Sequence, residues 1–271
     1  MTAGSMESSS MISRAHVLFG AYAVATAGAV GATGFSALSL GVPAACLLAL
    51  LADGIARPNS NLFYPTVSHG PRTQDRVALS FDDGPDPEVT PAVLDALAEH
   101  GARATFFAIG RQLEAHPRLA RRIAAEGHEL GNHSWRHSRW QNFFGTAEQA
   151  REIARGARAI AAVTGRSATP LYRPPIGLKS PPFARAARQA RLTLVGWSLR
   201  SRDTQTTDPE RIAARVLRRI RPGDIVLLHD GHDQPGRHRP ACARAVRLIL
   251  EGLRGKGLEC ATVSHLLEPS R

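Results

Sequence analysis

The chain has 271 residues, of which 43% are hydrophobic and 21% are charged. This composition supplies the apolar side chains of a sizeable core, so it excludes a chain that is disordered throughout. Gly, Pro and Cys number 24, 18 and 3, which excludes a collagen-like chain and a disulfide scaffold. At about 100–200 residues per domain, the length allows one large domain or two small ones.

The formal net charge of +11 is unevenly distributed. Arg14 and Arg57 balance Glu7 and Asp53 in the first 60 residues, so the whole excess lies in 61–271. A basic surface attracts nucleic acid, anionic lipid or acidic glycans. There is no basic run and no pattern of stacking aromatic residues, so we expect no nucleic-acid partner. The sequence predicts no protein partner either.

A long uncharged segment precedes the basic part of the chain, because 17–52 contains no Asp, Glu, Lys or Arg. A membrane-spanning helix needs ~20 apolar residues, whereas one helix of this length would measure about 54 Å against a hydrocarbon core of ~30 Å. Gly34-Phe35-Ser36 is the natural break. The segment therefore forms either two short spans, near 17–33 and 37–52, or one span in its Leu-rich second half.

A cleaved signal peptide is the alternative, but the apolar run exceeds the 7–15 residues of a signal-peptide core. We expect a retained anchor in a bacterial inner membrane, with membrane lipid around it. Arg14 and Arg57 flank the segment equally, so charge does not set its orientation. A single span would put the rest of the chain across the membrane from the N-terminus, and a hairpin would put both on one side.

After a polar, Pro-punctuated stretch, short apolar runs alternate with helical patterns. The expected strands are 77–81, 104–108, 129–132, a strand ending near 172–173, 192–197, 224–228 and 258–262. The expected helices are 90–99, with Thr90 as N-cap and Pro91 in first position, 117–126, 146–163, 181–190, 208–220 and 241–254. This alternation predicts a parallel α/β sheet, and seven such units favour a barrel over an open sheet.

In parallel α/β folds, functional residues gather just after the carboxyl ends of the strands. The chemically notable side chains of this sequence fall there: Asp82 and Asp83, His133 and His137, Arg173, Asp203, and His229. Each motif alone has a plainer explanation, such as a turn for Asp-Asp-Gly-Pro or a core histidine for His229. Their occurrence at successive strand ends favours a functional site.

The residue types indicate a metal site. Adjacent carboxylates at a strand end need a cation or a shared proton. Two histidines four residues apart can face one point, as where two imidazoles bind one metal. One Asp with two His gives a two-nitrogen, one-oxygen set with open positions, which suits Zn²⁺ and also Co²⁺ or Fe²⁺. A Lewis acid with open positions activates water near neutral pH.

Five segments, LSFDDGP, HSWRH, RPPIG, WSLRSRD and LLHDG, resemble in order the motifs of the polysaccharide deacetylase family, the NodB homology domain of carbohydrate esterase family 4. The resemblance covers roughly 75–266. It implies a distorted (β/α)7 barrel and a divalent metal, most commonly zinc. It also implies an enzyme that removes acetyl groups from N-acetylated amino sugars in a polysaccharide or a lipid-linked glycan. The chain would then divide into a polar tail (1–16), a membrane segment (17–52), a linker (53–75) and a catalytic domain (76–267).

The resemblance also implies a role for each motif residue. The metal ligands would be Asp83, His133 and His137. The catalytic groups would be Asp82 as the base that deprotonates water, Arg173 holding Asp82, His229 as the general acid, and Asp203 orienting His229. The oxyanion would be held by the metal and by a backbone N–H, either just after the first motif or in the RPPIG loop. The substrate contacts would be Pro174 and Gly177 of that loop, and Trp197 and Leu228 around the acetyl group.

The sequence departs from the family pattern at three positions. Ile176 stands in place of a usual Tyr, Arg200 in place of a frequent Asp, and Thr204 in place of a frequent Trp. Two other functions stay open: a non-catalytic barrel that binds a glycan, and a hydrolase of a formamide or an ester that uses the same metal site.

The other residues with reactive or aromatic side chains carry weaker expectations. We expect His128 to be structural. His232 and Asp233 either contact the substrate or lie in a solvated loop, and we expect the loop. Trp135 and Trp140 either stack on sugar rings or pack in the core. Cys242 and Cys260 either pair with each other or stay as two buried thiols.

Overall fold

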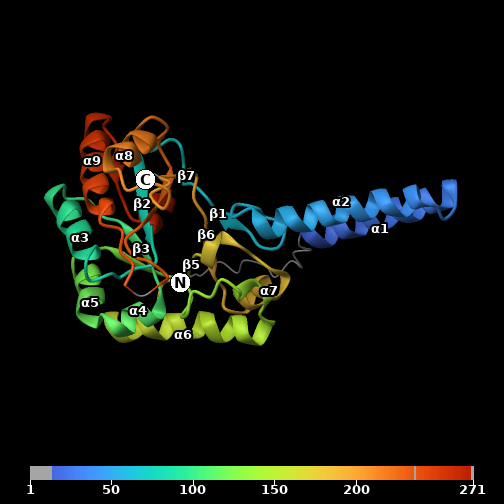
Figure 1. The fold of residues 1–271 in the computed structure, drawn as a ribbon, viewed down its shortest axis with the longest axis horizontal. Helices are drawn as coiled ribbons and strands as arrows, with labels where there is room; N and C mark the ends of the chain where they lie inside the picture. The colour runs from blue at the N-terminus through green and yellow to red at the C-terminus, as the bar shows by residue number, and fades with distance from the viewer. Residues whose placement is uncertain (1–13, 235, 270–271) are drawn as a thin grey trace, which may run out of the picture.

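The computed structural model describes residues 14–234 and 236–269, which form a helical hairpin and an α/β domain (Figure 1). The hairpin consists of α1 (Arg14–Thr33) and α2 (Ala37–Ala56), which lie side by side and project from the domain. The chain breaks where the sequence predicts, at Gly34, whose φ is +68°. Ser36 then caps α2, because its side chain accepts the N–H of Ser39. The expected polar tail lies outside the described residues up to residue 13.

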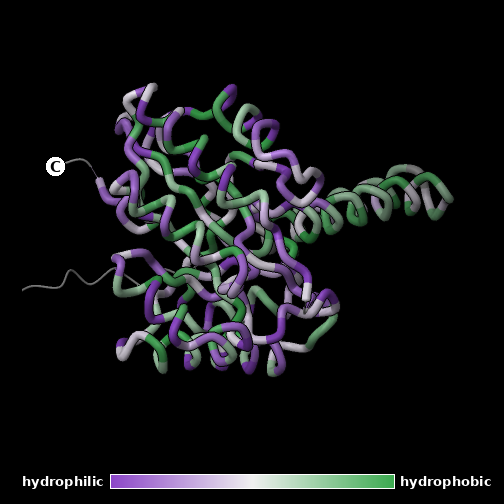
Figure 2. The backbone as a smooth tube through the Cα atoms, turned by 60° about the vertical axis from the view of Figure 1, so that its left-hand side comes forward, coloured by the Kyte–Doolittle hydropathy of each residue, from purple (hydrophilic) through white to green (hydrophobic). Residues whose placement is uncertain are grey.

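The hairpin is composed largely of hydrophobic residues along its length (Figure 2). Phe35 is 86% exposed and Leu38 is 77% exposed. Each helix has 20 residues and is therefore about 30 Å long, close to the ~30 Å of a bilayer core. By length and composition, Ala37–Ala56 could cross a membrane, whereas the apolar part of α1 is the shorter Val17–Ala32.

The domain is built on one curled sheet. Within the described residues its strands are β1 (Thr66–Val67), β2 (Arg76–Asp82), β3 (Thr105–Ala108), β4 (Glu129–Asn132), β5 (Leu171–Tyr172), β6 (Thr193–Val195), β7 (Leu199–Arg200), β8 (Ile225–His229) and β9 (Glu259–Cys260). The order is β1-β6-β5-β4-β3-β2-β8-β7, with β9 beside β2, and all of these pairings are parallel.

One stretch of chain crosses from one side of this curled sheet to the other. The strands β6 and β7 follow each other directly, yet β6 pairs with β5 while β7 pairs with β8 at the other end of the sheet. Between them, the N–H of Ser198 donates to the carbonyl of Ile225 at 3.0 Å. The expected strand at 192–197 is therefore the shorter β6, and β7 is an additional strand just beyond it. The fold is the expected distorted parallel barrel.

Helices surround the sheet. They are α3 (Thr90–Glu99), α4 (Gly110–Ala115), α5 (Pro117–Ala125), α6 (Thr146–Thr164), α7 (Pro181–Gln189), α8 (Pro209–Leu217), α9 (Ala241–Gly255) and α10 (Val263–Leu267), with 3₁₀ turns η1 (Gln141–Phe143) and η2 (Pro175–Gly177). The strand β2 is buried at six successive positions, as expected for a parallel strand covered on both faces. Its Phe81 stacks on Phe106 of β3 with ring centroids 4.9 Å apart.

Three local expectations need correction. Thr90 is the first residue of α3 rather than its N-cap; its hydroxyl instead donates to Asp230 Oδ2 at 2.6 Å. The helix α4 was not expected, because its six residues are too few to show a helical period. Cys242 and Cys260 are both free and buried, so the disulfide alternative does not hold.

The segment expected as a linker, 53–75, is instead packed on the barrel. It continues α2 to Ala56 and contributes β1 to the sheet. The fully buried Lys179 explains this packing, because a buried ammonium group needs acceptors. Its Nζ donates to the carbonyl of Pro58 at 2.7 Å and to Thr66 Oγ1 at 2.9 Å. The base of the hairpin is therefore joined to the barrel by direct contacts.

Candidate active site

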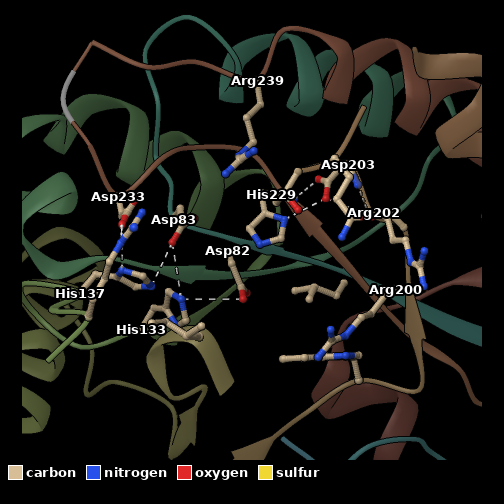
Figure 3. Close-up of a pocket in the computed structure, with 17 residues that line it drawn as sticks. Asp82, Asp83, His133, His137, Arg200, Arg202, Asp203, His229, Asp233 and Arg239 are labelled. Atoms are coloured by element: carbon tan, nitrogen blue, oxygen red, sulfur yellow. Dashed lines mark hydrogen bonds and ion pairs between the residues drawn. The ribbon is translucent and has the colours of Figure 1, made fainter. Parts of the chain in front are cut away.

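Three buried side chains that could hold a metal ion meet at the carboxyl ends of β2 and β4 (Figure 3). Asp83 Oδ1 lies 3.3 Å from His137 Nε2 and 3.6 Å from His133 Nε2. The three ligand atoms lie within 4.8 Å of one another. Asp83 and His137 both have positive φ, +73° and +53°. Such strained backbone is typical of functional sites.

The donor set fits a divalent cation. Asp83 Oδ1 is buried without a hydrogen-bond partner among the described residues, a costly state that a cation would relieve. His133 Nδ1 lies 2.7 Å from the carbonyl of Arg173, so Nδ1 carries the proton and the lone pair of Nε2 faces Asp83. Burial lowers the pKa of His133 to about 3, which leaves the neutral ring that a metal requires.

Asp82 is held beside this cluster by a buried arginine. Arg173 Nη1 donates to Asp82 Oδ1 at 2.7 Å, and Arg173 Nη2 donates to Ser80 Oγ at 3.0 Å and to the carbonyl of Gly196 at 2.9 Å. Burial lowers the pKa of Arg173, and the carboxylate of Asp82 opposes that shift. The other oxygen of Asp82 lies 3.8 Å from His133 Nε2. Asp82 therefore has one oxygen fixed and one turned toward the candidate metal ligands.

His229 and Asp203 form a second charged pair across the cavity (Figure 3). Asp203 Oδ1 lies 3.0 Å from His229 Nδ1, and Asp203 Oδ2 accepts the backbone N–H of His229 at 2.7 Å. Burial lowers the pKa of His229, but the charge and hydrogen bond of Asp203 outweigh it and raise that pKa to about 9. The ring is therefore protonated near neutral pH and can donate a proton from Nε2.

Apart from the buried Arg173, these groups line one cavity of about 530 Å³. Its lining joins Asp82, Asp83, His133 and His137 on one side to Asp203 and His229 on the other. Trp197 also lines it, as expected. The candidate ligands, the base and the acid are thus brought together from three separate segments of the chain.

Three residues that were expected to contact the substrate do not line the cavity. Leu228 is fully buried in the core on the helix side of β8, while Leu227 lines the cavity. Successive side chains of a strand point to opposite faces, so the two leucines cannot share a side. Pro174 and Gly177 are absent from the cavity lining, and the Gly177 N–H already donates to the carbonyl of Pro174 at 2.9 Å.

Ile176 takes the place expected for Gly177. It lines the cavity at φ +59°, and within the described residues its N–H has no hydrogen-bond acceptor. Gly177 has a packing role instead, because a Cβ there would lie 2.7 Å from Pro58 and 2.8 Å from the Trp197 ring. The alternation of β8 could have selected Leu227, which shares a face with His229.

Asp233 was expected in a solvated loop, but it lines the cavity. It lies 3.0 Å from Arg139 Nε and 4.0 Å from His137 Nδ1. His128 agrees with a structural role, because it is buried against Phe106 and burial lowers its pKa to about 4. Trp140 is 71% exposed, so it is not a core residue.

The fold and the cavity define a class of protein: a parallel α/β barrel with a candidate metal site beside an acid and a base, as in metal-dependent hydrolases. Comparison with known proteins narrows this class. The model of the family described as polysaccharide deacetylase matches residues 69–195. A chitooligosaccharide deacetylase of Bradyrhizobium sp. (strain ANU 289) is 38% identical over 201 residues, covering 70% of this chain and 90% of that protein.

Two further similarities concern proteins named for peptidoglycan. A peptidoglycan-N-acetylglucosamine deacetylase of Bacillus cereus is 36% identical over 199 residues, covering 73% of this chain and 90% of that protein. The crystal structure of a peptidoglycan N-acetylglucosamine deacetylase matches with a TM-score of 0.68 and 31% identity, covering 75% of this chain and 92% of that one. This chain belongs to the polysaccharide deacetylase family, and it is an enzyme of that family.

Proposed function

We propose that this enzyme hydrolyses the acetamide of an N-acetylated amino sugar in a glycan, releasing acetate and a free amine. One observation carries the proposal: Asp82, held by Arg173, and His229, held by Asp203, line the same cavity as the candidate metal ligands. Relatives named as chitooligosaccharide and peptidoglycan N-acetylglucosamine deacetylases support a glycan of N-acetylglucosamine as substrate.

The proton transfers follow from the two charged pairs. Asp82 accepts a proton from the water that adds to the acetyl carbon, and its hydrogen bond from Arg173 Nη1 holds the carboxylate in position for that role. The C–N bond then breaks, and protonated His229 gives its Nε2 proton to the departing nitrogen. Asp203 stabilises the charged form of His229 and fixes its ring.

Two further groups complete the proposed chemistry. Asp83, His133 and His137 would hold a divalent metal, with Zn²⁺ the foremost candidate, and such an ion supplies Lewis acidity that activates water and polarises a carbonyl. The N–H of Ile176 points to a role as donor to the carbonyl oxygen of the acetyl group as negative charge develops there. This role uses only the backbone, so it does not need the Tyr that is usual at this position.

Two alternative functions would use the same cavity. A deformylase or an esterase would use the same acid, base and metal ligands on a different bond. A non-catalytic glycan-binding barrel is disfavoured, because both charged pairs and all three candidate ligands are present together.

We also infer that the hairpin anchors the enzyme in a membrane, in contact with lipid and in a bacterial inner membrane. The exposed apolar side chains of α1 and α2 support this anchor, as does the hydrophobic character of the hairpin (Figure 2). The glycan would then be reached at the membrane surface, as a polymer or linked to a lipid. The expected domain division becomes a membrane hairpin to Ala56 followed by one catalytic domain that includes β1.

The test is acetate release by the full-length chain in detergent, with and without added Zn²⁺. The panel contains chitooligosaccharides, peptidoglycan and a lipid-linked amino sugar, each also in an N-formyl form. We expect acetate from at least one glycan, loss of activity with a chelator, and recovery when metal is restored. Formate release without acetate release would identify a deformylase, and metal-independent release would contradict the metal site.

A further inference from the structure

Two arginines on one wall of the cavity, Arg200 and Arg202, have no carboxylate partner among the described residues. Both line the cavity and are exposed. The two other arginines of the lining are engaged: Arg139 Nε pairs with Asp233 at 3.0 Å, and Arg239 Nε donates to the carbonyl of Gly231 at 2.9 Å.

The acidic side chains of the lining do not compensate Arg200 and Arg202. Asp82 is bonded to Arg173, Asp203 to His229, and Asp233 to Arg139. Asp83 belongs to the candidate metal cluster. The wall that carries Arg200 and Arg202 therefore keeps an uncompensated positive charge next to the reacting groups.

A ring contact and a backbone conformation also define the positions of Arg200 and Arg202. The Arg200 guanidinium lies 4.9 Å from the centroid of the Trp197 ring, a contact that fixes its plane and leaves its N–H groups free. Arg202 directly precedes Asp203 and adopts φ +59°, a costly conformation for a residue other than glycine. Figure 3 shows both on the side of His229 and Asp203, away from His133 and His137. His229 serves the departing amine, so the sugar that keeps the amine lies on this side.

We propose that Arg200 and Arg202 form a subsite for an oxyanion carried by the substrate, a phosphate or a carboxylate close to the sugar that loses its acetyl group. The planar N–H fork of a guanidinium matches both oxyanions, whereas a neutral glycan offers no charge to bind. This inference rests on the proposed function, since it locates the sugar by the role of His229.

The position of the hairpin favours a lipid-linked phosphate as the oxyanion that reaches Arg200 and Arg202. Its base contacts the loop beside the cavity, where a Cβ on Gly177 would lie 2.7 Å from Pro58 and the adjacent Ile176 lines the cavity. A glycan joined to a lipid through phosphate would present that phosphate near this base. A carboxylate borne by the sugar polymer is the other source of the same chemistry.

The experiment compares three glycans of matched length on the full-length, metal-loaded chain: chitotetraose, chitotetraose 1-phosphate, and a peptidoglycan tetrasaccharide with lactyl carboxylates. The test variant is Arg200→Gln with Arg202→Gln. The control is Arg218→Gln with Arg219→Gln, an exposed pair just after α8 and outside the cavity. Acetate release gives KM and kcat for each glycan. Equilibrium binding to chains that also carry Asp82→Asn gives Kd without turnover.

We expect the test variant to raise KM and Kd for an anionic glycan about 10- to 100-fold, the usual value of hydrogen bonds to a charged group. The effect on chitotetraose should be much smaller, kcat should change little, and the control should match the parent. Loss confined to the phosphate or to the carboxylate arm identifies the source of the anion.

Equal losses on neutral and anionic glycans, or a parent chain without any preference for the anionic ones, overturn the subsite. The binding arm separates this outcome from failure of the proposed function. Arginine-dependent binding without acetate from any glycan leaves the subsite standing and rejects the deacetylase proposal. Acetate release without a preference for anionic glycans rejects the subsite and leaves the deacetylase proposal standing.

Discussion

Two histidines of one cavity, the buried His133 and the half-buried His229, are held in opposite protonation states. Burial lowers the pKa of His133 to about 3, and the carboxylate of Asp83 only partly opposes this shift. Burial also lowers the pKa of His229, but Asp203 is hydrogen-bonded to its ring and raises that pKa to about 9. A neutral ring suits a metal ligand and a charged ring suits a general acid, so the neighbouring carboxylate decides which role each histidine can take.

The substitution Asp203→Asn tests this control of His229. The folded-state pKa of about 9 lies above the ordinary value of 6.5, so the acid form is present at low pH and is lost as pH rises through about 9. We expect the parent activity to fall on that alkaline limb. In the variant the limb should move to lower pH, and kcat should drop about 10²-fold or more near neutral pH. The pH profile of kcat/KM measures both effects.

The His229–Asp203 pair also stabilises the folded protein, and this stabilisation is lost with rising pH in the same direction as the activity. Its contribution is complete below about pH 6.5 and disappears as pH rises through about 9. An alkaline limb that does not move in Asp203→Asn would show that Asp203 does not set the pKa of His229.

Asp82 and His133 lie side by side but should respond differently to substitution. We expect Asp82→Asn to lower kcat about 10²–10⁴-fold while the bound metal stays, because Asp82 is assigned as the base. His133→Ala should lower the metal content, because it removes a candidate ligand. Elemental analysis of both purified variants, alongside acetate release, separates the roles. Metal loss in Asp82→Asn would instead make Asp82 a ligand.

At the scale of elements, strand alternation in β8 sorts neighbouring side chains between cavity and core. Leu227 lines the cavity, and Leu228 is fully buried among the residues that pack under the helices. The loop η2 makes a similar division, because Ile176 faces the cavity while Gly177 packs on Pro58. Adjacent residues of one motif therefore have different roles, because one lines the cavity and the other packs in the fold.

Alanine at each leucine of β8 tests this division. Leu228→Ala should lower the free energy of unfolding by about 2–5 kcal/mol, the usual cost of emptying a core position, with little change in KM. Leu227→Ala should act mainly on KM, because that side chain lines the cavity. Denaturant unfolding and acetate-release kinetics on both variants give the comparison. The reverse assignment of the two effects would contradict the placement of the strand.

At the scale of the whole molecule, the hairpin and the barrel are held together by direct contacts and not only by the connecting chain. The buried Lys179 bonds to Pro58 and Thr66, and Asn59 Nδ2 donates to the carbonyl of Trp197 at 2.7 Å. These contacts hold the end of α2 beside the mouth of the cavity. If the hairpin is inserted in a bilayer, the active site must lie close to its surface.

The hairpin also predicts a topology. Two antiparallel spans return the chain to its starting side, so reporters fused to the N-terminus and to the C-terminus should lie on the same side of the membrane. Compartment-specific reporter activity, or labelling of intact cells, measures this. Reporters on opposite sides would mean that one helix alone spans, with Ala37–Ala56 the candidate.

Much of the site could be predicted from the sequence because its residues follow strand ends. Parallel strands bring their carboxyl ends to one face of the sheet, so Asp83, His133 and His229 could be assigned to one site without coordinates. The family resemblance then gave each of them an expected role. The break at Gly34 was likewise visible, because helix length against bilayer thickness requires one.

Only the tertiary structure decided which residues far apart in the chain meet. The contact of Lys179 with Pro58 and the approach of Asp233 to His137 have no local sequence signal. The physical reason is that periodicity and turn residues encode local geometry, whereas these contacts depend on how the sheet curls and closes. The sequence by itself determined the parallel barrel and its reactive groups, and the packing of distant segments determined the shape and charge of the cavity around them.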